Sequence, residues 1–189
     1  MKNKNSAIVY GLIGAAIIIV LGLVMQMYIT SAMKKAVASG SSISPFKFLW
    51  IGIISFLVIA GVYIFFIIKT IKDYRKVNTD YTYGKLVGQG LLVTLIISLV
   101  STGFSILYNQ VIDPGAMKEN IELTEKVFDN MDIPDDQKEK TLAGMRDQDP
   151  VRQAVKSLAI TLVCGLIVSL ITASVLRKKE FPSNPNNLT

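Results

Sequence analysis

The residues that carry most enzyme chemistry are scarce in this sequence, and their positions restrict what they could do. The chain has no histidine, the side chain that titrates nearest to neutral pH. Its single cysteine, Cys164, lies in the middle of an apolar run and can form neither an internal disulfide nor a multi-cysteine metal site. Neither a glycine-rich phosphate loop nor a nucleophile elbow occurs. The sequence therefore predicts a protein that is not an enzyme and holds no cofactor.

Carboxylates are the remaining candidates, and most of them are gathered in one polar stretch. Residues 109–154 hold eleven acids and six bases. Three of the acids lie close together: Asp132, Asp135 and Asp136. They lack the twelve-residue pattern and the glycine of a calcium loop, so we expect a solvated acidic face and no metal site. A membrane-embedded enzyme would need these acids, Asp73 or Asp113 as chemical groups, and it is the weakest of the functional hypotheses.

The distribution of charge along the chain indicates that parts of it lie in a lipid bilayer. Hydrophobic residues make up 51% of the chain and charged residues only 18%, and the charges leave the interiors of four apolar runs free. These runs cover residues 6–29, 48–68, 86–108 and 155–176. Each is near or above the ~20 residues that cross a ~30 Å hydrocarbon layer as a helix, and lipid offers no partner to unpaired backbone groups. We predict an all-α, polytopic membrane protein: a single membrane domain over residues 1–189, with four transmembrane helices in a four-helix bundle.

Lysine and arginine set the expected orientation, because basic residues collect beside spans on the cytoplasmic side. The N-terminus, the connection after the second run and the C-terminal tail together hold ten basic residues, whereas the short first connection holds three. Four spans place the three segments with ten bases on one side. We therefore expect cytoplasmic N- and C-termini, with the acidic connection outside. The formal net charge of +6 then needs no nucleic-acid partner.

Four of these basic residues share one face if the second helix continues beyond the membrane: Lys69, Lys72, Arg75 and Lys76. Their charge is typical of a topogenic signal combined with contact to anionic lipid headgroups. A specific headgroup site or a partner site is the alternative interpretation.

The connection over residues 109–154 is expected to form two short helices outside the membrane. Asp113 fits the N-cap of the first, and Pro114 fits its first helical position, where the missing N–H costs nothing. One stripe then follows at helical spacing: Met117, Ile121, Thr124, Phe128 and Met131. A second helix is predicted over residues 135–146, after Pro134. The pair would cover the end of the bundle, lie on headgroups, or dock another protein.

Small residues recur at helical spacing in two of the runs, a pattern typical of transmembrane helices that approach closely. The fourth run contains Ser157, Thr161, Gly165, Ser169 and Ala173. The third contains Gly90, Thr94, Ser98 and Thr102. We expect these two helices to pack together, and a pore lining is the alternative. Gln26 and Gln89, near span ends, would make an interhelical hydrogen bond or an interfacial contact.

Several segments carry a resemblance to a known family. "IKDYRK" ends the helix of the second run, "YGKLVGQGLLVTLIISLVS" opens that of the third, and "ILYNQVIDP" leads out of it. The fourth run followed by "RKK" fits as well. With these segments the chain resembles the domain of unknown function 4199 family of small Gram-negative bacterial membrane proteins, although "VNTDYTYG" departs from the glycines usual before the third helix. The resemblance implies four spans and an inner-membrane location, and it brings no activity, cofactor or catalytic residue.

The functional hypotheses follow from what the spans lack. A coupled transporter normally keeps a buried charge in spite of an insertion cost of about 2.5–3.5 kcal/mol, and no Asp, Glu, Lys or Arg lies deep in any of the four runs. The leading hypothesis is a non-enzymatic scaffold or accessory subunit for a membrane partner. The alternative is a passive transporter or channel formed by a homo-oligomer. In both cases the chain contacts the lipid bilayer and either a partner membrane protein or itself.

Overall fold

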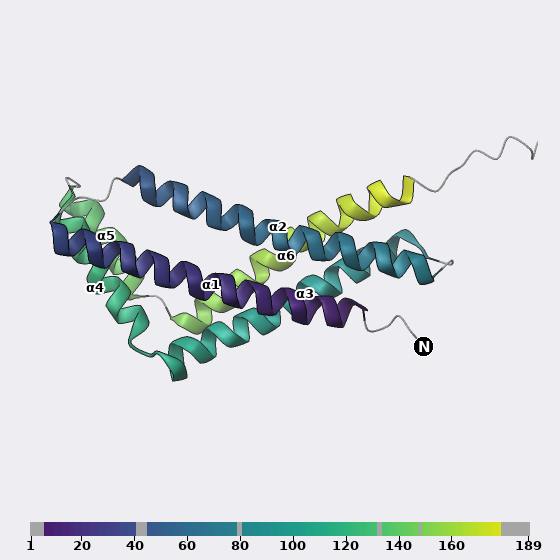
Figure 1. The fold of residues 1–189 in the computed structure, drawn as a ribbon, viewed down its shortest axis with the longest axis horizontal. Helices are drawn as coiled ribbons and strands as arrows, with labels where there is room; N and C mark the ends of the chain where they lie inside the picture. Colours follow the sequence, from purple (N-terminus) through teal and green to yellow (C-terminus); the bar gives the residue numbers. More distant parts are fainter. Residues whose placement is uncertain (1–5, 41–44, 79–80, 132–133, 148, 179–189) are drawn as a thin grey trace, which may run out of the picture.

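The computed structural model describes residues 6–40, 45–78, 81–131, 134–147 and 149–178, and every regular element within them is helical (Figure 1). The helices are α1 (Ser6–Ser39), α2 (Pro45–Val77), α3 (Tyr83–Leu107), α4 (Ala116–Asp129), α5 (Asp135–Arg146) and α6 (Pro150–Lys178). A π-helical turn, η1 (Tyr108–Ile112), continues α3. The all-α prediction is confirmed, and α1, α2, α3 with η1, and α6 are each long and apolar enough to cross a membrane.

The long helices run between two different ends of the molecule. The start of α1 and the end of α6 lie at one end of the molecule, which we call the terminal end (Figure 1). α4 and α5 lie at the opposite end, which we call the cap end. Two returning pairs of long helices therefore bring both ends of the described chain to the same side.

The long helices extend past the apolar runs that predicted them. α1 has 34 residues, which is about 51 Å at 1.5 Å per residue, against ~30 Å of hydrocarbon. The extension after Ile29 contains neither glycine nor proline until Gly40. Gly40 has a φ of 59°, the left-handed conformation that commonly follows the end of a helix. Lys34 and Lys35, counted with the first connection in the sequence, consequently lie on the last turns of α1.

The terminal halves of the long helices pack into a closed core. Six of its side chains are 0% exposed: Ile67, Ile71, Leu86, Val93, Ile97 and Ala173. α1 reaches this core through two glycines. A Cβ on Gly11 would lie 2.7 Å from Ile96 Cβ, and one on Gly14 would lie 3.0 Å from the ring of Phe66. Only hydrogen fits at these two positions, so α1 and α3 approach closely.

At the cap end, α4 packs against the last turns of α1 and forms a second, smaller core. Met33 of α1 is buried together with Leu123 and Val127 of α4 and with Met131, which follows α4. α5 runs from Asp135 to Arg146, as predicted, and lies beside α4.

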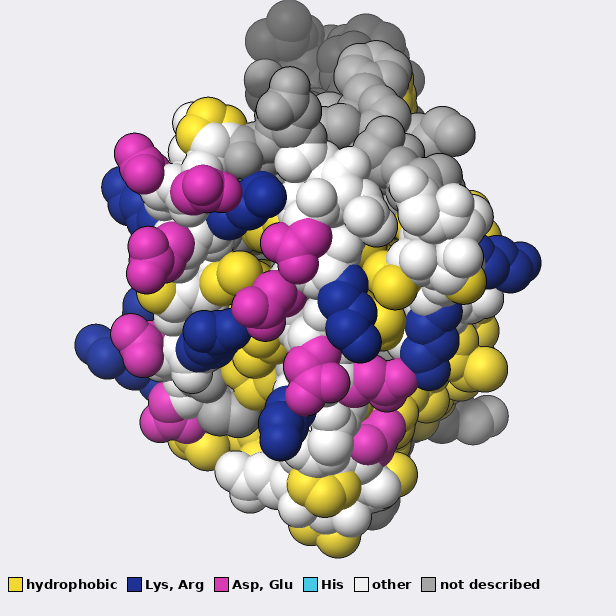
Figure 2. All heavy atoms as spheres, turned by 90° about the vertical axis from the view of Figure 1, so that its left-hand side faces the viewer, with side chains coloured by type: hydrophobic (Ala, Val, Ile, Leu, Met, Phe, Trp, Pro, Cys, Tyr) yellow, Lys and Arg dark blue, Asp and Glu magenta, His cyan; other side chains and the backbone are white. Residues whose placement is uncertain are grey.

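Charged side chains of both signs surround the smaller core, as Figure 2 shows for this end of the molecule. Lys34 Nζ lies 2.6 Å from Glu119 Oε1, which joins α1 to α4. Arg146 Nη2 lies 3.0 Å from Glu125 Oε2, which joins α5 to α4. Many of the acids predicted to form a solvated face therefore alternate with bases on the cap surface.

The connection from α3 to α4 differs from the prediction. The helix does not stop at Tyr108, because η1 continues it for five residues. The N–H of Asp113 donates to Tyr108 O at 2.8 Å and ends this π turn. Pro114 and Gly115 then form a turn, and α4 begins at Ala116 with Gly115 as its N-cap and no side-chain cap bond. Asp113 thus closes η1 instead of capping α4, and Pro114 precedes the helix instead of opening it.

Candidate functional site

The small-residue stripes of α3 and α6 meet in the terminal half of the molecule. A Cβ on Gly165 would lie 2.9 Å from Thr94 Cβ. One on Gly90 would lie 2.8 Å from Ser169 Cβ. Ala173 is fully buried one turn further along α6. The two backbones therefore approach each other closely along this part of the stripes.

The hydroxyl groups in this contact bond within their own helices. Thr94 Oγ1 donates to Gly90 O at 2.9 Å, and Ser169 Oγ donates to Gly165 O at 2.6 Å. A buried hydroxyl without a partner would be costly in apolar surroundings, and bonding to the preceding turn satisfies it without a partner on another helix. These four residues therefore serve packing and leave no hydroxyl hydrogen for a ligand.

Toward the cap end the same two stripes separate and line a cavity. Ser98 and Thr102 of α3, with Ser157 and Thr161 of α6, border a space of about 570 Å³, which we call the polar chamber. Further polar side chains complete its walls: Gln26, Tyr63, Ser101, Ser105, Asn109, Asn120 and Gln153. None of the described residues lining this chamber is Asp, Glu, Lys or Arg.

Two groups in the polar chamber show how its hydroxyls are arranged. Tyr63 Oη and Ser98 Oγ lie 3.3 Å apart and share a hydrogen bond. Ser101 Oγ is buried and has no hydrogen-bond partner among the described residues. The chamber thus combines satisfied hydroxyls with at least one that is free to pair.

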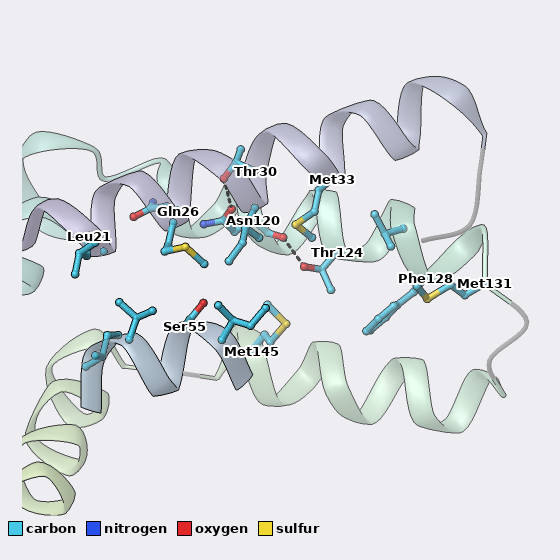
Figure 3. A pocket seen from close by; sticks show the side chains of 17 residues that line it. Leu21, Gln26, Thr30, Met33, Ser55, Asn120, Thr124, Phe128, Met131 and Met145 are labelled. Carbon is cyan, nitrogen blue, oxygen red and sulfur yellow. Dashed lines mark hydrogen bonds between the residues drawn. The ribbon is translucent and has the colours of Figure 1, made fainter. Parts of the chain in front are cut away.

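A second and larger cavity, the apolar chamber, has a volume of about 840 Å³ and lies between α1 and α2, with α4 and α5 on its cap side (Figure 3). Four methionines contribute to its walls: Met25, Met33, Met131 and Met145. Leucine, isoleucine, valine and phenylalanine side chains supply most of the rest. Both its volume and its lining match the pockets of about 300–1,000 Å³ in which proteins hold small apolar ligands.

The two chambers meet at a pair of carboxamide side chains. Gln26 and Asn120 line both cavities. Asn120 is held from two sides: Thr30 Oγ1 donates to its Oδ1 at 3.3 Å, and Thr124 Oγ1 donates to its backbone carbonyl at 2.7 Å (Figure 3). The sequence predicted either an interhelical hydrogen bond or an interfacial contact for Gln26. In the structure Gln26 lies at the junction of the two chambers.

The stripe predicted on α4 faces the chambers, whereas the side chains most buried against α1 come from its neighbouring face. Two of its residues line the polar chamber, Met117 and Ile121. Three line the apolar chamber, Thr124, Phe128 and Met131. The stripe therefore has the helical period that was predicted, and all four of its apolar side chains border a cavity.

Both chambers end where the closed core begins. On α1 and α2, the lining residues nearest to the terminal end are Ile18 and Tyr63. One turn further along α2, Phe66 and Ile67 are 5% and 0% exposed and belong to the core. The cavities thus occupy the cap half of the molecule and do not continue through the packed helices of the terminal half.

The basic cluster predicted on α2 lies in the terminal half, away from both chambers: Lys69, Lys72, Arg75 and Lys76. Asp73 lies within it, with Lys69 Nζ at 3.8 Å and Lys76 Nζ at 3.5 Å. Tyr10 of α1 donates to the same carboxylate at 2.5 Å. Asp73, which a membrane-embedded enzyme would have needed as a chemical group, therefore joins α1 to α2 and neutralises Lys69 and Lys76.

The acids of the cap do not assemble into a metal site in the described part of the chain. Asp135 and Asp136 are exposed, and Asp132 lies outside the described residues. No group of three or more His, Cys, Asp or Glu that could hold a metal ion occurs among the residues that the structure describes. Cys164 is exposed on α6, away from the chambers.

The chambers themselves were missed by sequence reasoning. Their clearest sequence signal is methionine, because five of the seven in the chain line one chamber or both: Met25, Met33, Met117, Met131 and Met145. Methionine is flexible and polarisable and is over-used at adaptable binding surfaces. Four of the five lie on three different helices and Met131 follows α4, so their common location appears only in the folded chain.

The fold defines the class of this protein. Four apolar helices of sufficient length to cross a bilayer, connected on alternating sides, make it a multi-pass membrane protein. Residues 9–178 match the model of a family described as "Protein of unknown function (DUF4199)", and the chain belongs to this family. The family expected from the sequence is thereby confirmed. No curated protein and no solved structure matches the chain.

Proposed function

We propose that this chain is a non-enzymatic accessory protein of the bacterial inner membrane, which holds an amphiphilic molecule of the bilayer for a membrane-protein partner. The observation that carries the proposal is the pair of connected chambers in the cap half. An apolar cavity beside an uncharged polar one is complementary to a molecule with an alkyl part and a polar part.

The composition of the chamber walls supports a binding role over a catalytic one. The described lining residues of the two chambers include no Asp, Glu, Lys, Arg, His or Cys. A serine or threonine hydroxyl is a weak nucleophile unless an adjacent base activates it, and these walls offer no such base. The hydroxyl and amide groups are suited to hydrogen bonding with a ligand that leaves unchanged.

We also propose that both termini face the cytoplasm and the cap end faces outward. The support comes from charge: the basic cluster of α2 lies in the terminal half, whereas the acids of residues 109–154 are gathered at the cap end. Basic residues beside spans are retained on the cytoplasmic side. Reporter fusions after Lys178 and between α4 and α5 test this orientation, and a cytoplasmic reporter at the second position would reverse it.

A partner or a second copy of the chain would meet α2, which has the least buried surface of the four long helices. Only 11% of its most apolar window is buried within the chain, and Phe56 and Leu57 are 69% and 61% exposed. A photo-crosslinking residue in place of Phe56 should capture one discrete protein in intact membranes. Capture of lipid alone would refute the membrane-protein partner but not the binding of an amphiphile.

Binding of an amphiphile is tested by filling the apolar chamber. Gly22 lines that chamber, and nothing lies within 4 Å of a Cβ built on it, so Gly22→Phe should fold and occupy the space. Gly103→Phe is the matched control, because Gly103 is equally open but does not line either chamber. Mass spectrometry of particles extracted with native lipid should find an amphiphile retained by the control and lost from Gly22→Phe. Equal retention by the two variants would contradict the proposal.

A passive transporter formed by a homo-oligomer is the second candidate, and the polar chamber is the observation that favours it. The closed core of the terminal half stands against a path through a single copy of the chain, so a transporter would need its path between copies. Release of glycerol from liposomes containing the protein separates the candidates. We expect the rate of empty liposomes, and sustained release above that rate would favour the transporter.

A further inference from the structure

We propose that the polar chamber selects an uncharged, hydroxyl-bearing lipid headgroup, of the kind found in a diacylglycerol, over the phosphate headgroup of an anionic phospholipid. This inference rests on the proposed function and adds the chemical class of the ligand. It is carried by the chemistry of the chamber walls, by one buried chamber hydroxyl that has no partner among the described residues, and by the pairing of the nearest lysine.

The walls of the polar chamber suit a hydroxyl group. Serine, threonine and tyrosine hydroxyls and the carboxamides of Asn109, Asn120 and Gln153 both donate and accept hydrogen bonds, as a lipid hydroxyl does. A phosphate brought into the same space would lose its hydration and meet no positive side chain among the described lining residues. Burial of an unpaired charge is far more costly than burial of a hydroxyl that finds partners.

One unpaired hydroxyl and the two carboxamides at the junction mark the positions for the headgroup and its linkage. Ser101 Oγ is buried without a partner in the described part of the chain, and it lines the polar chamber. At the junction, Asn120 Oδ1 accepts from Thr30, which directs the oxygen toward α1 and leaves the amide N–H groups as donors. Gln26 lies beside it on the same junction. Ester carbonyls, which only accept, would lie at this boundary between headgroup and acyl chain.

The apolar chamber provides for the acyl part. Its 840 Å³ lie between helices that cross the bilayer, so a chain can enter sideways from lipid without crossing water. The methionines in its walls can adopt many rotamers and fit chains that differ in length or unsaturation. Specificity then falls to the headgroup, because an adaptable apolar wall discriminates little between acyl chains.

The charges nearest to the chambers do not form an anion site. A third, shallower cavity of about 480 Å³ adjoins the junction and includes Lys34, Lys35, Asp113 and Glu119. Lys34 is already paired with Glu119 at 2.6 Å, and the carboxylates balance the lysines. Lys35 is the cation that an anionic headgroup would need to reach, so its removal is one arm of the test.

The test compares two photoactivatable lipids with the same diazirine-bearing acyl chain, one a diacylglycerol and the other a phosphatidylglycerol. Each is present at the same low fraction in phosphatidylcholine vesicles that hold the full chain, and crosslinked peptides are identified by mass spectrometry. We expect the diacylglycerol to label the chamber segments of α1, α4 and α5 roughly tenfold or more above the phosphatidylglycerol, since burying a charge costs several kcal/mol. Equal labelling would overturn the inference, as would labelling by phosphatidylglycerol that disappears in Lys35→Gln.

Two substitutions on one helix locate the headgroup. Ser157→Leu narrows the polar chamber and should reduce diacylglycerol labelling, whereas Ala159→Leu should not, because Ala159 is exposed outside the chamber. Ser157→Lys introduces the missing cation and should move the preference toward phosphatidylglycerol. Unchanged preference in both Ser157 variants would contradict a headgroup in this chamber. Labelling by either lipid that Gly22→Phe does not reduce would instead refute the proposed function itself.

Discussion

Replacing Gly90 with alanine should loosen the contact between α3 and α6. The added Cβ would lie 2.8 Å from Ser169 Cβ and 3.3 Å from Ile67 Cγ2, whereas carbon atoms in ordinary contact lie about 3.5–4.0 Å apart. The serine atom is bonded directly to its backbone, so no rotation of a side chain can relieve the overlap. The helices themselves must separate by roughly 1 Å, and overpacking of this kind costs about 1–3 kcal/mol.

A control and a compensating change make the prediction specific. Gly103→Ala, on the same helix, meets nothing within 4 Å and should be neutral or stabilising, because alanine favours a helix over glycine by about 1 kcal/mol. In the double variant Gly90→Ala with Ser169→Gly, the side-chain carbon moves from one helix to the other. The space at the contact is thereby restored, so the double variant should recover at least half of the lost stability.

Thermal unfolding in detergent, followed by circular dichroism, measures these differences. For a chain of this size each kcal/mol corresponds to a change in Tm of about 2–4 °C. Gly90→Ala should therefore unfold at a distinctly lower temperature than Gly103→Ala. The same Tm for the two single variants, or a double variant no more stable than Gly90→Ala, would refute the close packing of α3 on α6.

Three further substitutions, one of them paired with a control variant, test other contacts. Leu123→Ala, in the core between α4 and α1, should lower the free energy of unfolding by about 2–5 kcal/mol. Hydrogen exchange should then rise in α4 more than in the long helices, and an equal rise in all helices would contradict a separately anchored cap. Tyr10→Phe removes the hydroxyl that donates to Asp73 and should cost about 1.5–3 kcal/mol in chemical unfolding, because the acceptor is charged. Tyr28→Phe, at a residue 58% exposed, should leave the same measurement unchanged, and equal losses would argue against the bond. Lys34→Gln should change stability by less than about 1 kcal/mol, because its ion pair is exposed; a larger loss would mean that the cap depends on it.

The helices of this protein could be predicted from sequence because the requirements on them are local. A span must be long and apolar along its own length, and residues 86–108 satisfy this without reference to any other segment. The bounds of α5 likewise depend on neighbouring residues, because the helix begins directly after Pro134 and ends at Arg146. The length of α1 was underestimated because hydropathy marks the hydrocarbon, whereas the helix ends only at Gly40.

The chambers could not be predicted, because they depend on where helices separate. Thr94 and Ser98 belong to one stripe and lie one turn apart, yet Thr94 packs on Gly165 and Ser98 borders a cavity. Nothing local distinguishes the two residues. The point of separation is set by the angle between α3 and α6, which in turn depends on contacts between residues more than 70 positions apart in the chain. Asp113 failed as a cap because α4 begins at Ala116 with Gly115 as its N-cap, two residues beyond the cap position that the Asp-Pro pattern predicted.

The closed core of the terminal half restricts the leaflet from which a lipid could enter the chambers. If the termini face the cytoplasm, as proposed, the chambers of the described chain lie in its outward-facing half. A lipid made by an enzyme on the cytoplasmic face would have to be flipped before this protein could receive it. The protein would then act downstream of a flippase, and its occupancy would follow the composition of one leaflet independently of the other.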